Sequence, residues 1–329
     1  MTIGERIKTI RLSKGLTLDD MAKKLGYSNR SAFYKIENGY GVTTEKLKKI
    51  ADALEINFEE LLYDEEDYLN AKEVIKKAEE ANLIDDILYA VYGIHKETYY
   101  DFAIIAPSWY PEKIFSDDDN IILLKKAPYN SSYEIYTENN LKIAYIQCGS
   151  GASNLTDAML CLTSANIKKI FFVGAVGSIS KEYEIATLVT PSESISYDGV
   201  TPFFKKSIEK KMYGNRIIPY NMAEIDKNIE LIKENEIEIK KGKVFCIDSI
   251  LLEYSHIDEI KSTGAELIEM ETAAFYSCLR IMNKDGMALL LVSDNSQNKK
   301  SLVEKTIDDK NKYNYVRNNV IKKILYLIK

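Results

Sequence analysis

Two short acidic segments in the C-terminal half of the chain contain residue types that could bind a sugar and move a proton. In the first, Glu269 and Glu271 flank Met270 at an expected strand-to-helix junction. A carboxylate at Glu271 can accept two hydrogen bonds from vicinal hydroxyls, and the Met270 thioether can lie against an apolar sugar face. Alternatively, the two acids only complement the dipole of the following helix.

The second segment places Asp294 at the end of an expected buried strand, 288–292. A partly desolvated aspartate has a raised pKa and can donate a proton. The alternative is an Asp-Asn turn without chemistry. Two glycine turns, 148–151 and 174–177, could let a ligand approach the backbone, although most tight turns use glycine for steric reasons. The candidate ligand-loop glycines are Gly149, Gly151 and Gly174.

The elements that position these residues alternate between strands and helices from Phe102 onward. Such alternation predicts a doubly packed α/β sheet with ligands at the carboxyl ends of the strands. Strands are expected at 102–106, 121–124, 133–136, 141–148, 169–173, 188–195, 243–247 and 288–292, and helices at 153–165, 271–282 and 313–328.

Residues 1–63 differ from the rest and read as short helices with tight turns. Helices are expected at 3–12, 18–25, 30–37, 45–54 and 58–62, with caps at Thr17, Thr44 and Asn57. Two helices joined by a short turn form helix-turn-helix geometry, in which the second helix presents residues suited to bases and phosphates. These outward residues are Asn29, Arg30, Ser31, Tyr34 and Lys35. The alternative is a helical domain for protein contact.

Residues 64–100 form a connector that opens with an acidic run, 64–67. An apolar stripe between Tyr68 and Tyr92 predicts a helix or a helical pair. It is either a solvated linker or a dimerisation or domain-docking element, and the stripe favours the second because it needs a partner. The expected domains are therefore 1–63, 64–100 and 101–329.

Composition excludes several classes of protein. The 329 residues are 46% hydrophobic and contain no apolar run long enough for a membrane helix. Four scattered cysteines and two histidines argue against disulfide scaffolds and metal sites, and suggest a cytoplasmic protein. The net charge is -6, divided as +2 for residues 1–63 and -8 for the rest, which suggests different partners for the two parts.

The N-terminal segment resembles the Xre/Cro-type helix-turn-helix family. The matching pieces are Gly4–Lys8, Leu16–Ala22 and Ile36–Gly39. The resemblance implies DNA binding, usually as a homodimer. The modest charge of +2 and the acids Asp19 and Asp20 argue mildly against strong binding.

From about residue 101, four motifs in order resemble the purine nucleoside phosphorylase/uridine phosphorylase superfamily, and specifically its methylthioadenosine/S-adenosylhomocysteine nucleosidase-like branch. The motifs are 173–178, Asp198-Gly199, 269–271 and Ser293-Asp294. The resemblance implies an all-α helix-turn-helix domain followed by a three-layer α/β nucleoside phosphorylase-like domain. It implies that Glu271 and Met270 hold the ribose of a purine nucleoside or nucleotide. It also implies that Asp294, next to Ser293, faces purine N7, that Ile250 packs near the base, and that no cofactor or metal is needed.

Phosphorylases of the family bind phosphate with arginines, whereas here Phe172 occupies one of those places and the loop 107–111 contains none. No arginine occurs between Arg30 and Arg216, and a phosphate dianion needs fixed donors. We therefore expect water as the nucleophile, with Glu112 the nearest residue to activate it. Two alternatives stay open: a regulator whose second domain only senses a purine, and a phosphate-dependent phosphorylase. Ala175, where nucleosidases often have serine, favours the sensor.

Overall fold

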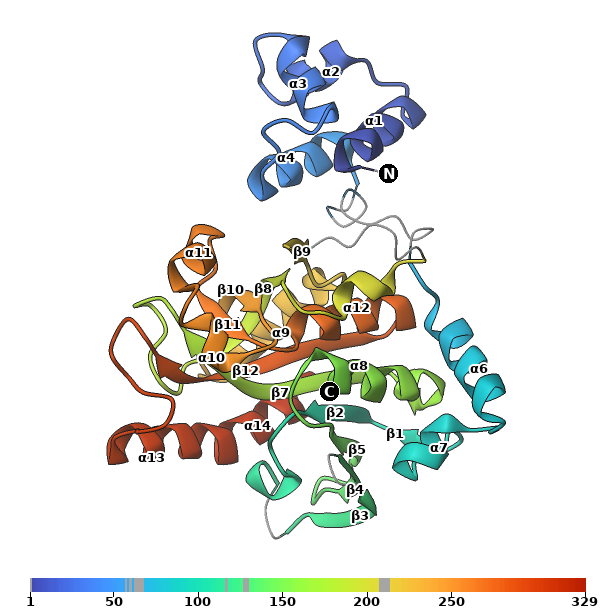
Figure 1. Cartoon of the computed structure of the whole chain (residues 1–329), viewed down its shortest axis with the longest axis vertical. Coiled ribbons are helices and arrows are strands. Elements are labelled where there is room, and N and C mark those ends of the chain that lie inside the picture. Colours follow the sequence, from blue (N-terminus) through green and yellow to red (C-terminus); the bar gives the residue numbers. More distant parts are fainter. Residues whose placement is uncertain are drawn as a thin grey trace. The chain divides into compact units, whose positions relative to one another are not determined.

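The computed structural model of the chain describes residues 2–56, 58, 61, 68–115, 118–126, 130–206 and 214–329. The chain divides into two compact units, 1–68 and 69–329, which are described separately below (Figure 1). Within the described residues, no helix has both the length and the apolar character needed to cross a membrane.

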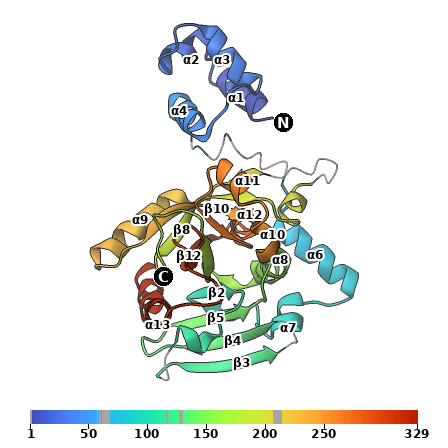
Figure 2. The ribbon, with the colours of Figure 1, turned by 60° about the vertical axis from the view of Figure 1, so that its left-hand side comes forward.

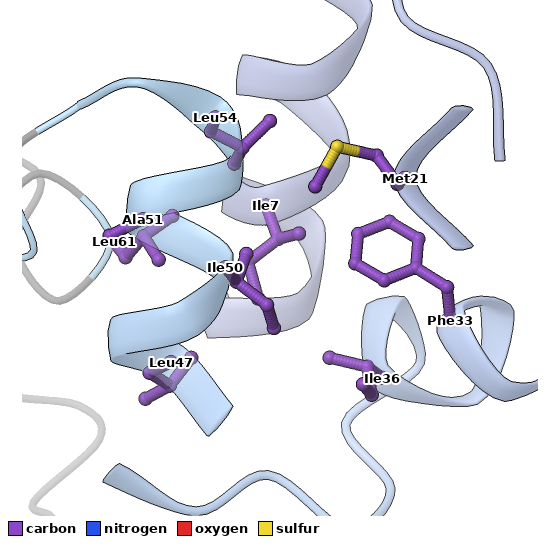
Figure 3. Packing of buried hydrophobic residues seen from close by; sticks show 9 residues of the cluster. All are labelled: Ile7, Met21, Phe33, Ile36, Leu47, Ile50, Ala51, Leu54 and Leu61. Atoms are coloured by element: carbon purple, nitrogen blue, oxygen red, sulfur yellow. The ribbon is translucent and has the colours of Figure 1, made fainter. Parts of the chain in front are cut away.

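The first unit contains helices joined by short turns. Their bounds are α1 (Ile3–Ser13), α2 (Leu18–Lys24), α3 (Arg30–Glu37) and α4 (Thr44–Leu54). Apolar side chains from all of them point into one core (Figure 3), which consists of Ile7, Met21, Phe33, Ile36, Leu47, Ile50, Ala51, Leu54 and Leu61. A buried ion pair ties α1 to α3, with Arg11 Nε 2.6 Å from Glu37 Oε1. The expected helices 3–12, 18–25 and 30–37 are thus present to within a residue at each end.

Helix caps explain where these helices begin. Thr17 and Asp20 form a capping box at α2, as the sequence predicts for Thr17. The predicted cap of α4 is wrong by one position, because the Thr43 hydroxyl accepts the hydrogen bond from Lys46 N and Thr44 is already helical. Thr43 and Thr44 have the same side chain and can cap a helix equally well, so the sequence did not show which of the two is the cap. The expected cap at Asn57 lies outside the described residues.

The second unit is organised around a mixed sheet. Its strands are β1 (Tyr99–Tyr100), β2 (Phe102–Ala106), β3 (Asn120–Lys126), β4 (Ser131–Tyr136), β5 (Lys142–Gln147), β6 (Asn166–Ile167), β7 (Lys169–Ser178), β8 (Leu188–Ser196), β9 (Asn215–Ile217), β10 (Lys240–Cys246), β11 (Leu267–Glu269) and β12 (Asp285–Asn295). The main path runs β11-β10-β8-β12-β7-β2-β5-β4-β3, while β9 pairs with β8 and β1 pairs with β6. An additional pairing of β11 with β7 closes the first five strands into a ring.

Helices cover both faces of this sheet, which gives three layers. Their bounds are α6 (Ala71–Asn82), α7 (Ile87–Tyr92), α8 (Ala152–Cys161), α9 (Met222–Glu234), α10 (Ile250–Glu253), α11 (Ile257–Ser262), α12 (Thr272–Met282), α13 (Ile307–Tyr315) and α14 (Ile321–Ile328). Figure 2 shows α9 and α13 on one side of the sheet and α6 and α8 on the other. The expected fold class, an all-α helix-turn-helix domain plus a three-layer α/β domain, is confirmed.

Several expected elements differ in extent, among them β10, which is Lys240–Cys246 instead of 243–247, and β12, which is Asp285–Asn295 instead of 288–292. The predicted turn 174–178 is the second half of β7, because pairing with β12 continues through both glycines despite their low strand propensity. The C-terminal helix begins at Ile307, where Thr306 caps a polar first turn, and it contains a π-helical segment, Val316–Val320. The predicted helix 153–165 ends at Cys161 and continues as a short 3-10 turn.

The connector is a helical pair, α6 and α7, as its apolar stripe predicts. Ala71 and Ile75 of α6 are buried, and the helix packs on α8 and α12 of the second unit. The stripe therefore has its partner within the same unit, which supports domain docking rather than dimerisation. The acidic run 64–67 lies outside the described residues.

Candidate active site

The loops that follow β2, β5, β7 and β12 meet at one edge of the sheet. These four strands are parallel neighbours, so their carboxyl ends point the same way. The motif residues Gly149, Gly151 and Asp294 lie at these ends. Strand β11 joins the same place through its pairing with the end of β7, and it brings the acidic junction 269–271. The topology thus assembles segments more than a hundred residues apart in the chain.

Asp294 lies near the end of β12, where its register partner on β7 is Gly177. A Cβ atom at Gly177 would stand 3.2 Å from Asp294 Oδ2, so glycine leaves room for the carboxyl group. The Ser293 hydroxyl donates a hydrogen bond of 2.6 Å to Asp294 Oδ1. Burial raises the pKa of Asp294, against the lowering effects of Ser293 and the Lys305 ammonium. A carboxyl group in this environment can carry a proton to a ligand.

Glu271 links the acidic junction to the glycine turn. Its Oε1 accepts a hydrogen bond of 2.6 Å from the amide of Gly151. Gly149 and Gly151 have φ angles of 80° and 102°, a region in which a side chain would be strained, so glycine is required for this turn. Burial and the nearby Glu269 charge raise the pKa of Glu271 to about 8. Met270 is half-buried beside it.

Glu269 holds the junction in place, a role that the sequence did not indicate. Its carboxylate accepts hydrogen bonds from the amide nitrogens of Glu271 and Thr272, at 2.7 and 2.9 Å. It also accepts from the Thr272 hydroxyl and the Cys246 thiol, both at 2.8 Å. Because the carboxylate satisfies the first amides of α12, it fixes the direction in which Glu271 leaves the strand.

The first loop approaches the same region. Tyr145 donates a hydrogen bond of 2.6 Å to the Trp109 carbonyl oxygen. Glu112 lies in the short 3-10 helix Pro111–Lys113 and is exposed. Burial raises the pKa of Tyr145, with further contributions from Cys148 and Glu112, so these groups are electrostatic neighbours. The Glu271 charge in turn raises the pKa of Cys148, after burial. Glu112 and Glu271 therefore act electrostatically on two neighbouring residues at the end of β5, Tyr145 and Cys148 respectively.

The arginine place on β7 is apolar. Phe172 is buried, and its ring centroid lies 5.6 Å from that of Phe275. Gly174, expected in a turn, lies within β7 directly beside this ring, since a Cβ atom there would be 3.2 Å from Phe172 Cζ. Arg216, the next arginine in the chain, donates its hydrogen bonds to Glu193 and to the Thr263 carbonyl. The position of Phe172 on β7, where an arginine was expected in a phosphorylase, is therefore filled by a buried aromatic pair.

Helix α10, which the sequence did not predict, carries Ile250 at its first position. Ser249 caps the helix by accepting from Leu252 N, and Ile250 is 44% exposed. Two further residues near Asp294 were missed: Glu253 at the end of α10, and Lys305 after β12. A single charged residue in a four-residue helix or after a strand gives no periodic signal, so the sequence did not associate Glu253 or Lys305 with Asp294.

The polar face of α3 is arranged as the sequence predicts. Arg30, Ser31, Tyr34 and Lys35 are exposed, while the core side of the helix is buried. Asn29 is exposed as well, but its side-chain oxygen caps α3 by accepting from Ala32 N. Arg30 lies 3.8 Å from Asp19 of α2 in an exposed ion pair. The unit presents hydrogen-bond donors along one helix face.

The fold and this edge of the sheet define an α/β domain of the nucleoside-processing type, joined to a helix-turn-helix domain. Residues 101–327 match the family model of the phosphorylase superfamily, and residues 7–61 match that of a helix-turn-helix. The first match covers more than half of the chain, and the chain belongs to the phosphorylase superfamily.

Two curated relatives that match part of the chain are purine nucleoside phosphorylases. DeoD-type purine nucleoside phosphorylases of Anoxybacillus flavithermus and Geobacillus stearothermophilus are 23% identical over 137 residues, which cover 40% of this chain and 54% of theirs. The match thus spans about half the length of these curated relatives.

Solved structures share the fold of the second unit. The AMP nucleosidase of Bacteroides thetaiotaomicron has a TM-score of 0.54 at 17% identity, covering 68% of this chain and 90% of that one. The 5'-methylthioadenosine/S-adenosyl homocysteine nucleosidase of Campylobacter jejuni also has 0.54 at 17%, covering 70% and 98%. The uridine phosphorylase of Vibrio fischeri has 0.57 at 17%, covering 71% and 94%.

Proposed function

We propose that the second unit hydrolyses the N-glycosidic bond of a purine nucleoside or nucleotide. The observation that carries the proposal is the pair of buried carboxyl groups at one sheet edge, both with raised pKa. Asp294 is placed to donate a proton, and Glu271 is held by Gly151 where a diol could be bound. Purine nitrogen N7 is the natural acceptor for that proton, and uracil has no equivalent atom.

In the proposed mechanism, Asp294 protonates N7 as the bond between C1′ and N9 breaks. The base leaves as a neutral purine and the sugar passes through an oxocarbenium-like state. Glu271 and Met270 hold the ribose. Water adds to C1′, and Glu112 takes its proton. A single general acid of this kind contributes about 10²–10⁴-fold to the rate.

Water is favoured over phosphate as the nucleophile by the side chains around the site. Phe172 gives an aromatic ring where phosphorylases have an arginine, and the loop 107–111 contains no arginine. A phosphate dianion needs fixed, preferably bidentate donors to leave water. Because the relatives include phosphorylases, the dependence of the reaction on phosphate should be tested directly.

A purine sensor is the second candidate function, favoured by two observations. Ala175 occupies a place where nucleosidases often have serine, and Glu112 is exposed. A ligand-binding domain without turnover would still use Glu271 and Asp294 for recognition. The sensor hypothesis fits a chain that begins with a helix-turn-helix domain.

We further infer that the first unit binds DNA through α3. Arg30, Ser31, Tyr34 and Lys35 supply side chains of the types that contact phosphates and base edges. We expect the chain to act as a homodimer on a two-fold operator, as the resemblance to the Xre/Cro-type helix-turn-helix family implies.

The activity is tested by incubating the purified chain with adenosine, methylthioadenosine, inosine, AMP and ATP, with and without phosphate. Release of free base without phosphate is expected. Release only with phosphate would identify a phosphorylase, and no release together with purine binding would identify a sensor.

Asp294→Asn should lower kcat by about 10²–10⁴-fold, because asparagine keeps the shape of the side chain but cannot give up a proton in the same way. Asp258→Asn, an exposed residue of α11, is the matched control. Thermal unfolding checks that both variants are folded. An unchanged kcat in Asp294→Asn would remove this residue from the mechanism.

A further inference from the structure

Strand β3 is the last strand at one end of the main sheet. The path of the sheet ends in β11 and β3, and β11 also pairs with β7, whereas β3 pairs with β4 alone among the described strands. Figures 1 and 2 show β3 at the margin of the second unit, beyond β5 and β4. One side of β3 therefore presents backbone N–H and C=O groups without a neighbouring strand in the described part of the chain.

The centre of β3 is apolar and is left uncovered on both of its faces. Ile122 is 39% exposed and Leu123 is 50% exposed, and the flanking Ile121 and Leu124 are partly exposed. Successive residues of a strand point to opposite faces, so apolar surface is exposed on both sides of this sheet edge. An exposed apolar edge strand is a template for pairing with a further strand.

The charges at the two ends of β3 indicate which strand fits beside it. Asp118 and Asp119 precede the apolar run, and Lys125 and Lys126 follow it. Asp119 and Lys125 bind partners within the same unit. Asp118 and Lys126 are exposed. When two identical strands pair antiparallel, the acidic end of each strand lies beside the basic end of the other, which is favourable. A second copy of β3 therefore complements this edge.

A two-fold axis at Ile122 brings apolar side chains together and opposite charges together. In this register Ile122 faces its own copy, Ile121 faces Leu123, and Asp118 lies near Lys126 at each end of the paired strands. Cross-strand pairs of these kinds stabilise an antiparallel sheet. Moving the axis by one residue, to Leu123, would set Ile121 opposite a lysine.

We propose that β3 pairs antiparallel with β3 of a second copy of the chain, which joins two sheets into one across a two-fold axis at Ile122. An interface of this kind is self-complementary and is used up within the pair, so association stops at the dimer. The proposal gives the homodimer expected above a surface in the second unit. It does not depend on whether that unit is catalytic.

Disulfide formation in the full chain tests the register. In Ile122→Cys two introduced thiols face each other, because facing Cα atoms of an antiparallel pair are about 4.5–5.5 Å apart, a distance that a disulfide spans. All four native cysteines are buried, so the introduced thiol is the accessible one. We expect mild oxidation to convert most of the chain into a covalent dimer. Leu231→Cys, on α9 and 37% exposed, is the matched control and should give little dimer.

Sedimentation of the full chain over a range of concentrations measures the strength of the pairing. Ile122→Lys should weaken dimerisation at least about tenfold, because two ammonium groups would face each other at the axis and an apolar contact would be lost. Asp118→Lys and Lys126→Asp should each weaken it by roughly three- to tenfold at low salt, since each change sets like charges together at both ends. The double variant should restore the wild-type affinity, and Leu231→Lys should leave it unchanged.

A wild type that stays monomeric at about 100 μM would overturn the proposal. So would a dimer that persists unchanged in Ile122→Lys when Ile122→Cys forms no disulfide, because association would then use another surface. A double charge variant as weak as its two single variants would show that the register is wrong. Thermal unfolding checks that the variants are folded. If Ile122→Lys does not fold, Leu123→Lys at the more exposed neighbouring position takes its place, and wild-type affinity in that variant would count against the pairing.

Discussion

Glu271, to which the proposed function assigns ribose binding, is unfavourable for stability at neutral and higher pH. Its pKa of about 8 in the folded chain exceeds that of an ordinary glutamate, so the native state holds a proton that the unfolded state releases. Stability is present below the unfolded pKa and falls as pH rises from about 4.5 towards 8.

Glu271→Gln should therefore stabilise the second unit at pH 8 by at least about 1 kcal/mol, with little change at pH 4.5. The amide oxygen can still accept from Gly151, so the turn is kept. Denaturant unfolding at the two pH values measures this, with exposed Glu230→Gln as control. The same variant should lose nucleoside binding. If the free energy of unfolding had the same pH dependence in Glu271→Gln and in the wild type, Glu271 would not have the raised pKa that we assign to it.

At the scale of elements, the close approach of α1 to α3 depends on Gly4. A Cβ atom at Gly4 would stand 2.2 Å from the Glu37 carbonyl oxygen, a backbone atom that cannot move without displacing α3. Gly4→Ala should destabilise the first unit by roughly 1–3 kcal/mol, as overpacking does. Lys8→Ala, on the exposed side of α1, is the control. The melting temperature of the first unit, followed by circular dichroism, measures the effect of each variant. Equal melting temperatures for Gly4→Ala and Lys8→Ala would contradict the proposed need for glycine at position 4.

Lys322 of the C-terminal helix forms ion pairs with Asp119 and Glu138, of which the one with Asp119 is the shorter. Lys322 Nζ lies 2.6 Å from Asp119 Oδ2, and the Asp119 side chain is fully buried. Lys322→Met should cost about 3 kcal/mol in the free energy of unfolding, because it leaves a buried carboxylate without its cation. Lys323→Met, the exposed neighbour on the same helix, should cost far less. Denaturant unfolding measures the free energy of unfolding of both variants. A decrease of less than about 1 kcal/mol for Lys322→Met would show that the ion pair with Asp119 contributes little to stability.

At the scale of the whole molecule, charge is uneven along the chain, with +2 on residues 1–63 and -8 on the rest. Arg30→Ala should weaken binding to an operator selected from genomic DNA by about tenfold and reduce the salt dependence by about one ion. Arg317→Ala, which removes the same charge from the second unit, should leave binding unchanged. Fluorescence anisotropy at several salt concentrations measures both. Equal affinities for the Arg30 variant and the wild type would discard α3 as the DNA-reading helix.

Local signals were sufficient where one residue type decides a boundary. Thr17 caps α2 as expected, and the buried strand 102–106 has the predicted bounds. Local sequence signals failed where pairing with a distant strand outweighed the low strand propensity of glycine. Strand β7 continues through Gly174 because β12 pairs alongside it.

The sequence by itself determined the two kinds of domain and the acidic residues that are candidates for the site. Helix capping, strand patterning and residue chemistry are local properties, so they can be read from the order of the motifs. Only the tertiary structure decided which of those acids meet. Strand β7 pairs in parallel with β12, which carries Asp294, and its end pairs antiparallel with β11, which leads to the junction that holds Glu271. Burial raises the pKa of both Asp294 and Glu271, with a further contribution from Glu269 to that of Glu271, and burial in the folded chain cannot be read from the local sequence.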